Sequence, residues 1–335
     1  MAGYKHGFMA EFEKLVGRPL LHIHCITHGL EKFFSHVFVY YAGPTTGPES
    51  WSGDEAKILQ GSIWDLQVEA FEAMPSPVLR ALLDTIPPAV LKEFNHDTRY
   101  LLEMARAVES GHLEERWARC KAGVMTNVRW SNTQSRELRV YMSTASPSNA
   151  QRRMTSFIIY VCVPSFLEIR QKNLLLEGPR HLLAITTRVA TYCTEEEVSL
   201  LRPFIQYNGY FAQHEVVLAS LLASEEREQR EVALEVMKKL QRKEERSKRK
   251  TVWKVKNPEI NLAATKLSEL VDLEKATSSP PILSKHTKEE LEQFLEEPYS
   301  EPDLPCTTTA VERGVRLTTE AATVVSGALE LTWTS

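Results

Sequence analysis

Between about residue 27 and residue 250, the apolar residues of this chain recur at intervals of three and four. This spacing places apolar side chains along one face of an α-helix, and it is the main sequence signal for helical structure. Only one strand candidate precedes the helical region, the short alternating segment from Leu20 to Ile26. The predicted fold class is therefore mainly α, a multi-helical domain with a short β element near the N-terminus.

The pattern predicts a series of helices interrupted by loops. Residues 42–62 are predicted to be a loop because glycine and proline recur there. The segment 148–163 is strongly apolar and is predicted to be the central buried helix. Residues 277–335 are rich in Ser, Pro, Thr and Glu and are predicted to be largely disordered. Helices are predicted over 4–16, 27–41, 76–84, 87–94, 97–109, 126–144, 148–163, 180–193, 195–205, 214–223, 226–250 and 262–273, and over 287–297 behind a capping box at Thr287 and Glu290.

Composition narrows the class of protein. The chain has 335 residues, of which 43% are hydrophobic and 25% charged, the ordinary balance of a globular protein. Its five cysteines are scattered without a Cys-x-x-Cys pair, which argues for a reducing, intracellular compartment. No segment has the length and apolar character of a signal peptide or a membrane span, so no membrane partner is expected.

The most informative charged segment is basic and spans residues 238–256. At helical spacing it would form a stripe able to meet phosphates or a nuclear import receptor, which weakly favours the nucleus. The competing interpretation is a solvated helix face paired with the acidic residues before it. The candidate nucleic-acid-binding residues are Lys238, Lys239, Arg242, Lys243, Arg246, Lys248, Arg249 and Lys250, with Lys254 and Lys256 beyond them.

Two other features invite a functional interpretation. Cys25 and His28, with two histidines nearby, have the residue types of a zinc site. A zinc site needs three or four ligands that converge on one point, whereas Cys25 lies on the opposite strand face from the two nearby histidines and no second ligand pair follows at a suitable distance. The segment is therefore predicted to be a buried strand-to-helix junction, and no metal or other cofactor is expected. Trp130, after Arg129, would serve as an interaction anchor or, more often, as a core residue. The sequence contains no GxSxG, P-loop, GxGxxG or HExxH motif.

An ordered set of short motifs resembles a group of transposon-derived proteins of invertebrate genomes, distantly similar to hAT-type transposases. The set covers residues 5 to about 283 and consists of Gly17-Arg18-Pro19-Leu20, Cys25-x-x-His28-x-x-Glu31, Thr45-Thr46-Gly47-Pro48 with Ser52-Gly53, Arg129-Trp130, Leu138-Arg139-Val140-Tyr141 with Pro147-Ser148, Gly178-Pro179-Arg180-His181, Asn208-Gly209-Tyr210-Phe211-Ala212-x-His214-Glu215 and Trp253-Lys254-Val255-Lys256-Asn257-Pro258. The resemblance implies an RNase H-like core with a helical insertion.

Two departures from that group shape the expected function. The chain begins after the Asp-Gly-type motif, so both early catalytic aspartates are absent, and Leu30 stands where the group tends to have Asn. Glu215 is the candidate for the third acidic residue, and a lone glutamate cannot hold two metal ions. The resemblance thus implies residues 1–41 as the remnant of the core, 42–62 as the loop, 63–275 as the helical domain and 277–335 as the tail.

The expected function is therefore that of a catalytically inactive, transposase-derived protein or fragment, not an enzyme. It would contact DNA non-specifically through residues 238–256, or associate with itself or a protein partner through the helical domain. The alternatives are a helical scaffold that binds only protein and an expressed pseudogene product.

Overall fold

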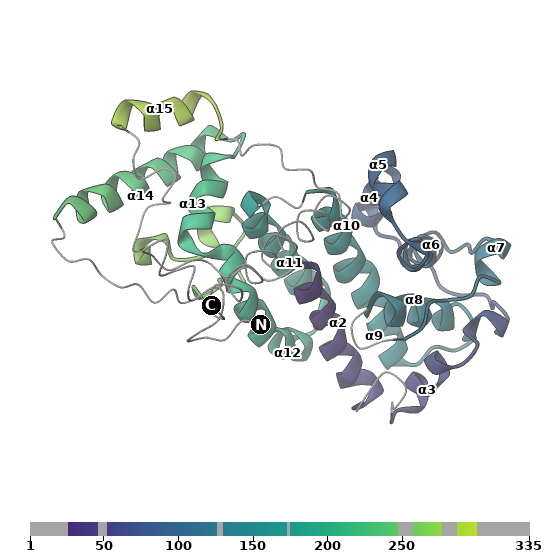
Figure 1. Cartoon of the computed structure of the whole chain (residues 1–335). Coiled ribbons are helices and arrows are strands. Elements are labelled where there is room, and N and C mark those ends of the chain that lie inside the picture. The colour runs from purple at the N-terminus through teal and green to yellow at the C-terminus, as the bar shows by residue number, and fades with distance from the viewer. Residues whose placement is uncertain are drawn as a thin grey trace, which may run out of the picture.

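The computed structural model describes residues 26–45, 52–125, 130–172, 175–246, 257–276 and 287–299. These residues are mainly helical, as predicted, and contain no β-strand (Figure 1). Of the predicted β element, residues 20–25 lie outside the described part, and Ile26 is already helical. The predicted helix 4–16 and extended piece 252–255, and residues 300–335 of the predicted tail, also lie outside it.

Helix α2 (Ile26–Ala42) lies in the middle of the molecule, between α12 on one side and α8, α9 and α10 on the other (Figure 1). Five apolar residues at helical spacing form its buried face and are each at most 4% exposed, namely Leu30, Phe33, Phe34, Val37 and Phe38. One contiguous hydrophobic core, from Leu30 to Leu291, joins the described helices.

Helices α3 (Asp54–Gln60), α4 (Pro77–Asp84), α5 (Pro88–Glu93), α6 (His96–Ser110), α7 (Glu115–Ala118) and α8 (Trp130–Tyr141) form one side of the molecule (Figure 1). Side-chain caps set several starts, because the Ser76 and Asn95 oxygens accept backbone N–H groups three residues ahead. The prediction of a loop over 42–62 is wrong where α3 forms. Residues 54–60 contain no glycine or proline, and within them Ala56 and Leu59 are buried.

The predicted central helix is longer than expected. Helix α9 (Asn149–Phe157) continues through a π-helical turn (Ile158–Cys162) into α10 (Val163–Gln171). Pro164, one residue beyond the predicted end at 163, lies in the first turn of α10. A proline inside a regular α-helix clashes with the carbonyl four residues before it, and the wider π turn precedes Pro164 at that place.

The other side of the molecule holds α11 (Gly178–Tyr192), α12 (Glu195–Tyr207), α13 (His214–Leu222), α14 (Arg227–Arg246) and α15 (Lys288–Glu296). All five confirm predicted helices, including the capping box of Thr287 and Glu290 that starts α15. Short 3-10 turns complete the described structure at Ile63–Asp65, Leu175–Glu177, Asn208–Ala212, Leu267–Glu269 and Leu273–Lys275.

The predicted helix 262–273 is wrong, since residues 262–273 form turns that include the two last 3-10 segments. Local side chains occupy the backbone donors instead. Asn261 Oδ1 accepts the Ala263 N–H at 3.0 Å, and Glu269 Oε2 accepts the N–H groups of Thr265 and Lys266. Such side-chain bonds compete with helix formation. Among the described residues, no helix is both long and apolar enough to cross a bilayer.

Candidate functional site

Helix α14 separates an apolar face from a basic face. Ala233, Leu234, Met237 and Leu240 are buried, each at most 6% exposed. Lys239, Arg242 and Lys243 are exposed, and their spacing of three and four residues aligns them on the opposite face. We call these three residues the basic stripe. Arg246 follows at the same spacing, in the last position of α14.

The residues of the basic stripe are not paired with carboxylates, although the exposed Glu235 lies four residues before Lys239. Lys239, Arg242 and Lys243 form no ion pair within the part of the chain that the structure describes. Lys238 differs, because its ammonium group lies 3.0 Å from Glu292 Oε1 of α15. Of the other candidates, Lys248, Arg249 and Lys250 lie outside the described residues, as do Lys254 and Lys256. The structure thus places three of the eight predicted contact residues on one exposed face.

Helix α15 packs against α14 and lies above it in Figure 1. Arg227 pairs with Glu296 at 3.0 Å, and Arg230 donates to the Leu295 carbonyl oxygen at 2.7 Å. Leu291 of α15 is fully buried. Acidic residues of this chain therefore dock along part of α14 and leave the basic stripe exposed.

Of the candidate motif residues Cys25, His28, Glu31, Arg129 and Trp130, the structure describes the side chains of Glu31 and Trp130. Trp130 is half-buried and packs against the core: its ring lies 5.9 Å from that of Phe34 and 6.4 Å from that of Phe38. Glu31 is half-buried in α2. Cys25 and Arg129 lie outside the described residues, and the side chain of His28 is not described.

Glu215, the vestigial catalytic candidate, lies half-buried in the first turn of α13. The neighbouring His214 places Nε2 3.1 Å from the Asp272 carbonyl oxygen, and burial lowers the pKa of this histidine. Within the described ranges, no three His, Cys, Asp or Glu side chains converge as metal ligands would. A two-metal site needs such convergence.

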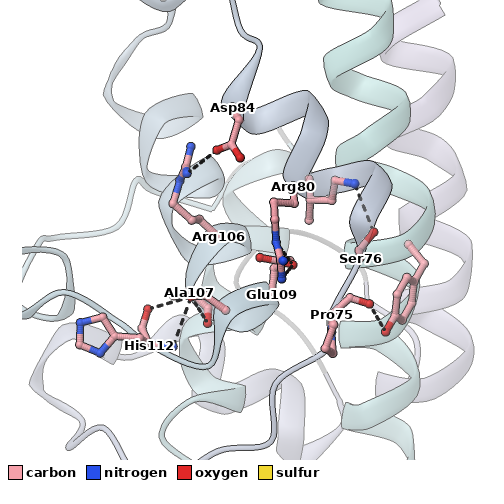
Figure 2. A network of polar contacts seen from close by, with 11 residues as sticks. Pro75, Ser76, Arg80, Asp84, Arg106, Ala107, Glu109 and His112 are labelled. Atoms are coloured by element: carbon pink, nitrogen blue, oxygen red, sulfur yellow. Dashed lines mark hydrogen bonds and ion pairs between the residues drawn. The ribbon is translucent and has the colours of Figure 1, made fainter.

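A groove of about 290 Å³ runs between α4, α6 and α7. Its charged groups are largely paired with one another. Arg80 Nε donates to Glu109 Oε1 at 2.9 Å, and Arg106 pairs with Asp84 at 3.1 Å. Glu109 is only 4% exposed. These pairs fasten α4 to α6, so the polar network in Figure 2 primarily serves the packing of the two helices.

Sequence reasoning missed a buried carboxylate at the start of α12. Glu197 is completely buried and accepts from Arg153 of α9 and from the Tyr41 hydroxyl of α2, the latter at 2.8 Å. Its second oxygen accepts the Thr194 N–H at 2.8 Å. Burial and the bond to Glu197 raise the pKa of Tyr41 to about 12. The Thr-x-x-Glu spacing of 194–197 was the available signal, because it is the pattern of a capping box.

Comparisons with known proteins add no relative. No family model matches the chain, and no curated protein or solved structure matches it significantly.

Proposed function

We propose that this chain contacts nucleic acid through the basic stripe of α14, without sequence preference and without catalysing a reaction. The observation that carries the proposal is the exposure of Lys239, Arg242 and Lys243 on one helix face, free of internal ion pairs among the described residues. Cations at this spacing meet successive phosphates, and the release of counterions from nucleic acid then drives binding.

The basic stripe together with Arg246 has a length that suits a duplex backbone. From Lys239 to Arg246 the helix rises about 10 Å, at about 1.5 Å per residue. Lys248, Arg249 and Lys250 follow in the sequence and would extend the contact. The same residues would be recognised by a nuclear import receptor, which supports a nuclear location in the proposal.

The non-catalytic part of the proposal rests on the carboxylates. Nuclease and strand-transfer chemistry needs acidic side chains that hold two metal ions about 4 Å apart. Glu215 is the described residue that the transposase resemblance offers for this purpose, and it has no convergent pair of ligands around it in the described ranges. We therefore propose a transposase-derived binding protein rather than an active transposase.

The test compares two variants with the same change in net charge. One carries Lys239→Gln, Arg242→Gln and Lys243→Gln, and the control carries Lys92→Gln, Lys172→Gln and Arg202→Gln, three exposed cations on other helices or loops. Binding to a random-sequence DNA duplex is measured across a salt series. The stripe variant should reduce the slope of log K against log salt by about 2 to 3, and the control should keep the wild-type slope.

Equal slopes for both variants would contradict the proposal. A protein-only scaffold is the second candidate, favoured by the docking of acidic α15 along α14 through Lys238–Glu292 and Arg227–Glu296. That scaffold predicts no measurable duplex binding by the wild-type chain at any salt concentration, while an acidic helical peptide still binds and is displaced by salt.

A further inference from the structure

A thiol, an imidazole and a carboxylate lie in a row where α6 begins. Cys120 Sγ lies 3.2 Å from His96 Nε2, and His96 Nδ1 lies 3.6 Å from Asp97 Oδ1. His96 and Asp97 are the first two residues of α6, and Cys120 belongs to the loop after α7. Cys120 is partly exposed and His96 is exposed. A nucleophile, a base and a group that orients the base are the three parts of an activated thiol.

The order of the three groups favours one tautomer of the His96 ring. A carboxylate beside Nδ1 favours the tautomer with the proton on Nδ1, which leaves Nε2 as an acceptor for the Cys120 S–H. Asp97 is itself held in place, because its Oδ2 accepts from Asn132 Nδ2 at 3.2 Å. Asn132 is 2% exposed and donates also to the Val124 carbonyl oxygen at 2.8 Å.

Unsatisfied polar atoms surround this row. The hydroxyl of Tyr100 and the side-chain oxygen of Asn132 are buried and have no hydrogen-bond partner among the described residues, and the same holds for the indole nitrogen of Trp117. The Tyr100 ring stacks on His96 at 6.3 Å and also lies 6.3 Å from Trp117. Buried polar groups without partners are rare in folded proteins and require an explanation such as a functional role. Three such atoms lie on residues that contact the row or one another.

The loop that carries Cys120 is held tightly against the row. A Cβ at Gly123 would lie 2.5 Å from Asp97 Oδ1 and 2.7 Å from Asn132 Nδ2. Residue 123 therefore accommodates no side chain, and the close approach keeps the loop and the start of α6 in register.

The charged and titratable groups near the thiol come from three elements. Asp97 and Tyr100 belong to α6, as does His96, and Arg116 of α7 lies over the Trp117 ring at 5.4 Å. From α8, Arg136 and Arg139 act on Tyr100. Burial raises the pKa of Tyr100 to about 12, so its hydroxyl stays protonated across neutral pH.

We propose that Cys120 is a reactive thiol that exchanges with small disulfides, with His96 as the base that takes its proton. In the step, Cys120 Sγ forms a bond to one sulfur of the disulfide and the disulfide bond breaks. His96 Nε2 accepts the thiol proton and passes it to the departing thiolate, so a mixed disulfide and one free thiol result. No net oxidation or reduction occurs.

Burial of Cys120 and a nearby base have opposite effects on the rate of thiol exchange at neutral pH. Burial alone raises the pKa of the Cys120 thiol, and a thiol without a base would then react only at alkaline pH. With His96 as proton acceptor, the rate should instead already be high near neutral pH and level off well before the alkaline range. The shape of the pH profile therefore separates the two cases.

The test uses 2-hydroxyethyl disulfide, a neutral probe that does not titrate, on the full chain. Rates are followed for each cysteine by mass spectrometry of its peptide. Cys162 and Cys193 are internal controls, because burial raises the pKa of Cys193 to about 12 and holds that of Cys162 well above its ordinary value. At about pH 7 we expect Cys120 to react about tenfold or more faster than either.

The variant His96→Gln should lower the Cys120 rate about tenfold or more near pH 7 and leave it unchanged near pH 10, where the thiolate forms without a base. An equal rate at pH 7 in the variant and the wild type would overturn the proposal. So would a wild-type profile that rises steadily to pH 10 without levelling off, and this second readout does not depend on the folding of the variant.

Discussion

At the scale of single residues, Glu197 joins three helices through one carboxylate. It is fully buried at the start of α12 and accepts from Arg153 of α9 and Tyr41 of α2. A buried charge is tolerated only when its partners are complete, and removal of one partner leaves the other without compensation. The stability of the junction between α2, α9 and α12 should therefore depend on this charge.

We expect Glu197→Gln to lower the free energy of unfolding by about 3 kcal/mol, because Arg153 loses its buried counter-charge. Urea denaturation measures the change. The matched control is Glu195→Gln, an exposed residue in the same helical turn, which should stay within about 0.5 kcal/mol of wild type. Similar losses for both variants would show that the charge at the helix start, not the buried pair, matters.

At the scale of elements, α8 is unusual because polar residues on all its sides are buried. Arg139 is 1% exposed and donates to the carbonyl oxygen of Leu66 at 2.6 Å and to that of Ala118 at 3.3 Å. Arg136 donates to the carbonyl oxygens of Leu59 and Gly61 at 2.6 Å and 3.1 Å. Two guanidinium groups thus tie α8 to the C-terminal ends of α3 and α7 and to the segment that follows α3.

The prediction for this element is that Arg139→Lys destabilises the chain by about 3 kcal/mol even though the charge is kept. A lysine ammonium group cannot reproduce the planar fork that reaches two separate carbonyl oxygens, and those acceptors stay buried. Thermal or chemical denaturation tests this. Arg119→Lys, at an exposed ion pair with Glu115, is the control and should change stability by less than about 0.5 kcal/mol. A loss below about 1 kcal/mol for Arg139→Lys would contradict the role given to the fork.

The helices also show which parts of the fold can be predicted from the sequence. Helices with local signals were predicted well: the apolar stripe of α2 and the capping box at Thr287 depend only on neighbours in the chain. Helix α3 was missed because the surrounding glycines and prolines dominate its window. Residues 262–273 were predicted to be helical because the competing bonds of Asn261 and Glu269 are not visible in a periodic pattern.

The candidate sites differ in the same respect. The exposed basic residues of α14 could be predicted from the sequence, because residues three or four apart lie on the same face of a helix. The pairing of His96 with Cys120 could not, since 24 residues separate them and only the fold brings them together. Arg153 and Glu197 are likewise 44 residues apart.

At the scale of the whole molecule, burial of histidines couples stability to pH. The pKa of His181 is lowered by burial, and that of His36 by burial and by the charge of Lys32. The pKa of His214 is lowered by burial as well. The folded state therefore binds fewer protons than the unfolded state near the ordinary histidine pKa. The stability from each histidine is complete above about pH 6.5 and is lost as pH falls through the lowered value.

His36 offers the cleanest test, because its ring stacks on Phe204 at 3.6 Å and phenylalanine preserves the stack. We expect His36→Phe to lose less stability than wild type between about pH 7.5 and pH 5, since one lowered pKa is removed. Unfolding free energies at the two pH values give the comparison. His112→Gln, at an exposed histidine, should behave as wild type. Equal pH losses in His36→Phe and wild type would mean that His36 titrates alike in both states.

The π-helical turn at Ile158–Cys162 has a consequence for how the chain tolerates changes in length. Each residue of an α-helix rotates the next by about 100°, so one extra residue in a turn shifts the phase of everything after it. The faces of α9 and α10 are set by that shift. A one-residue deletion between 158 and 162 would restore a regular helix, yet it would turn the whole downstream surface of α10 away from α4 and α11. In this helix, the length of the chain is as much a part of the packing as the identity of its side chains.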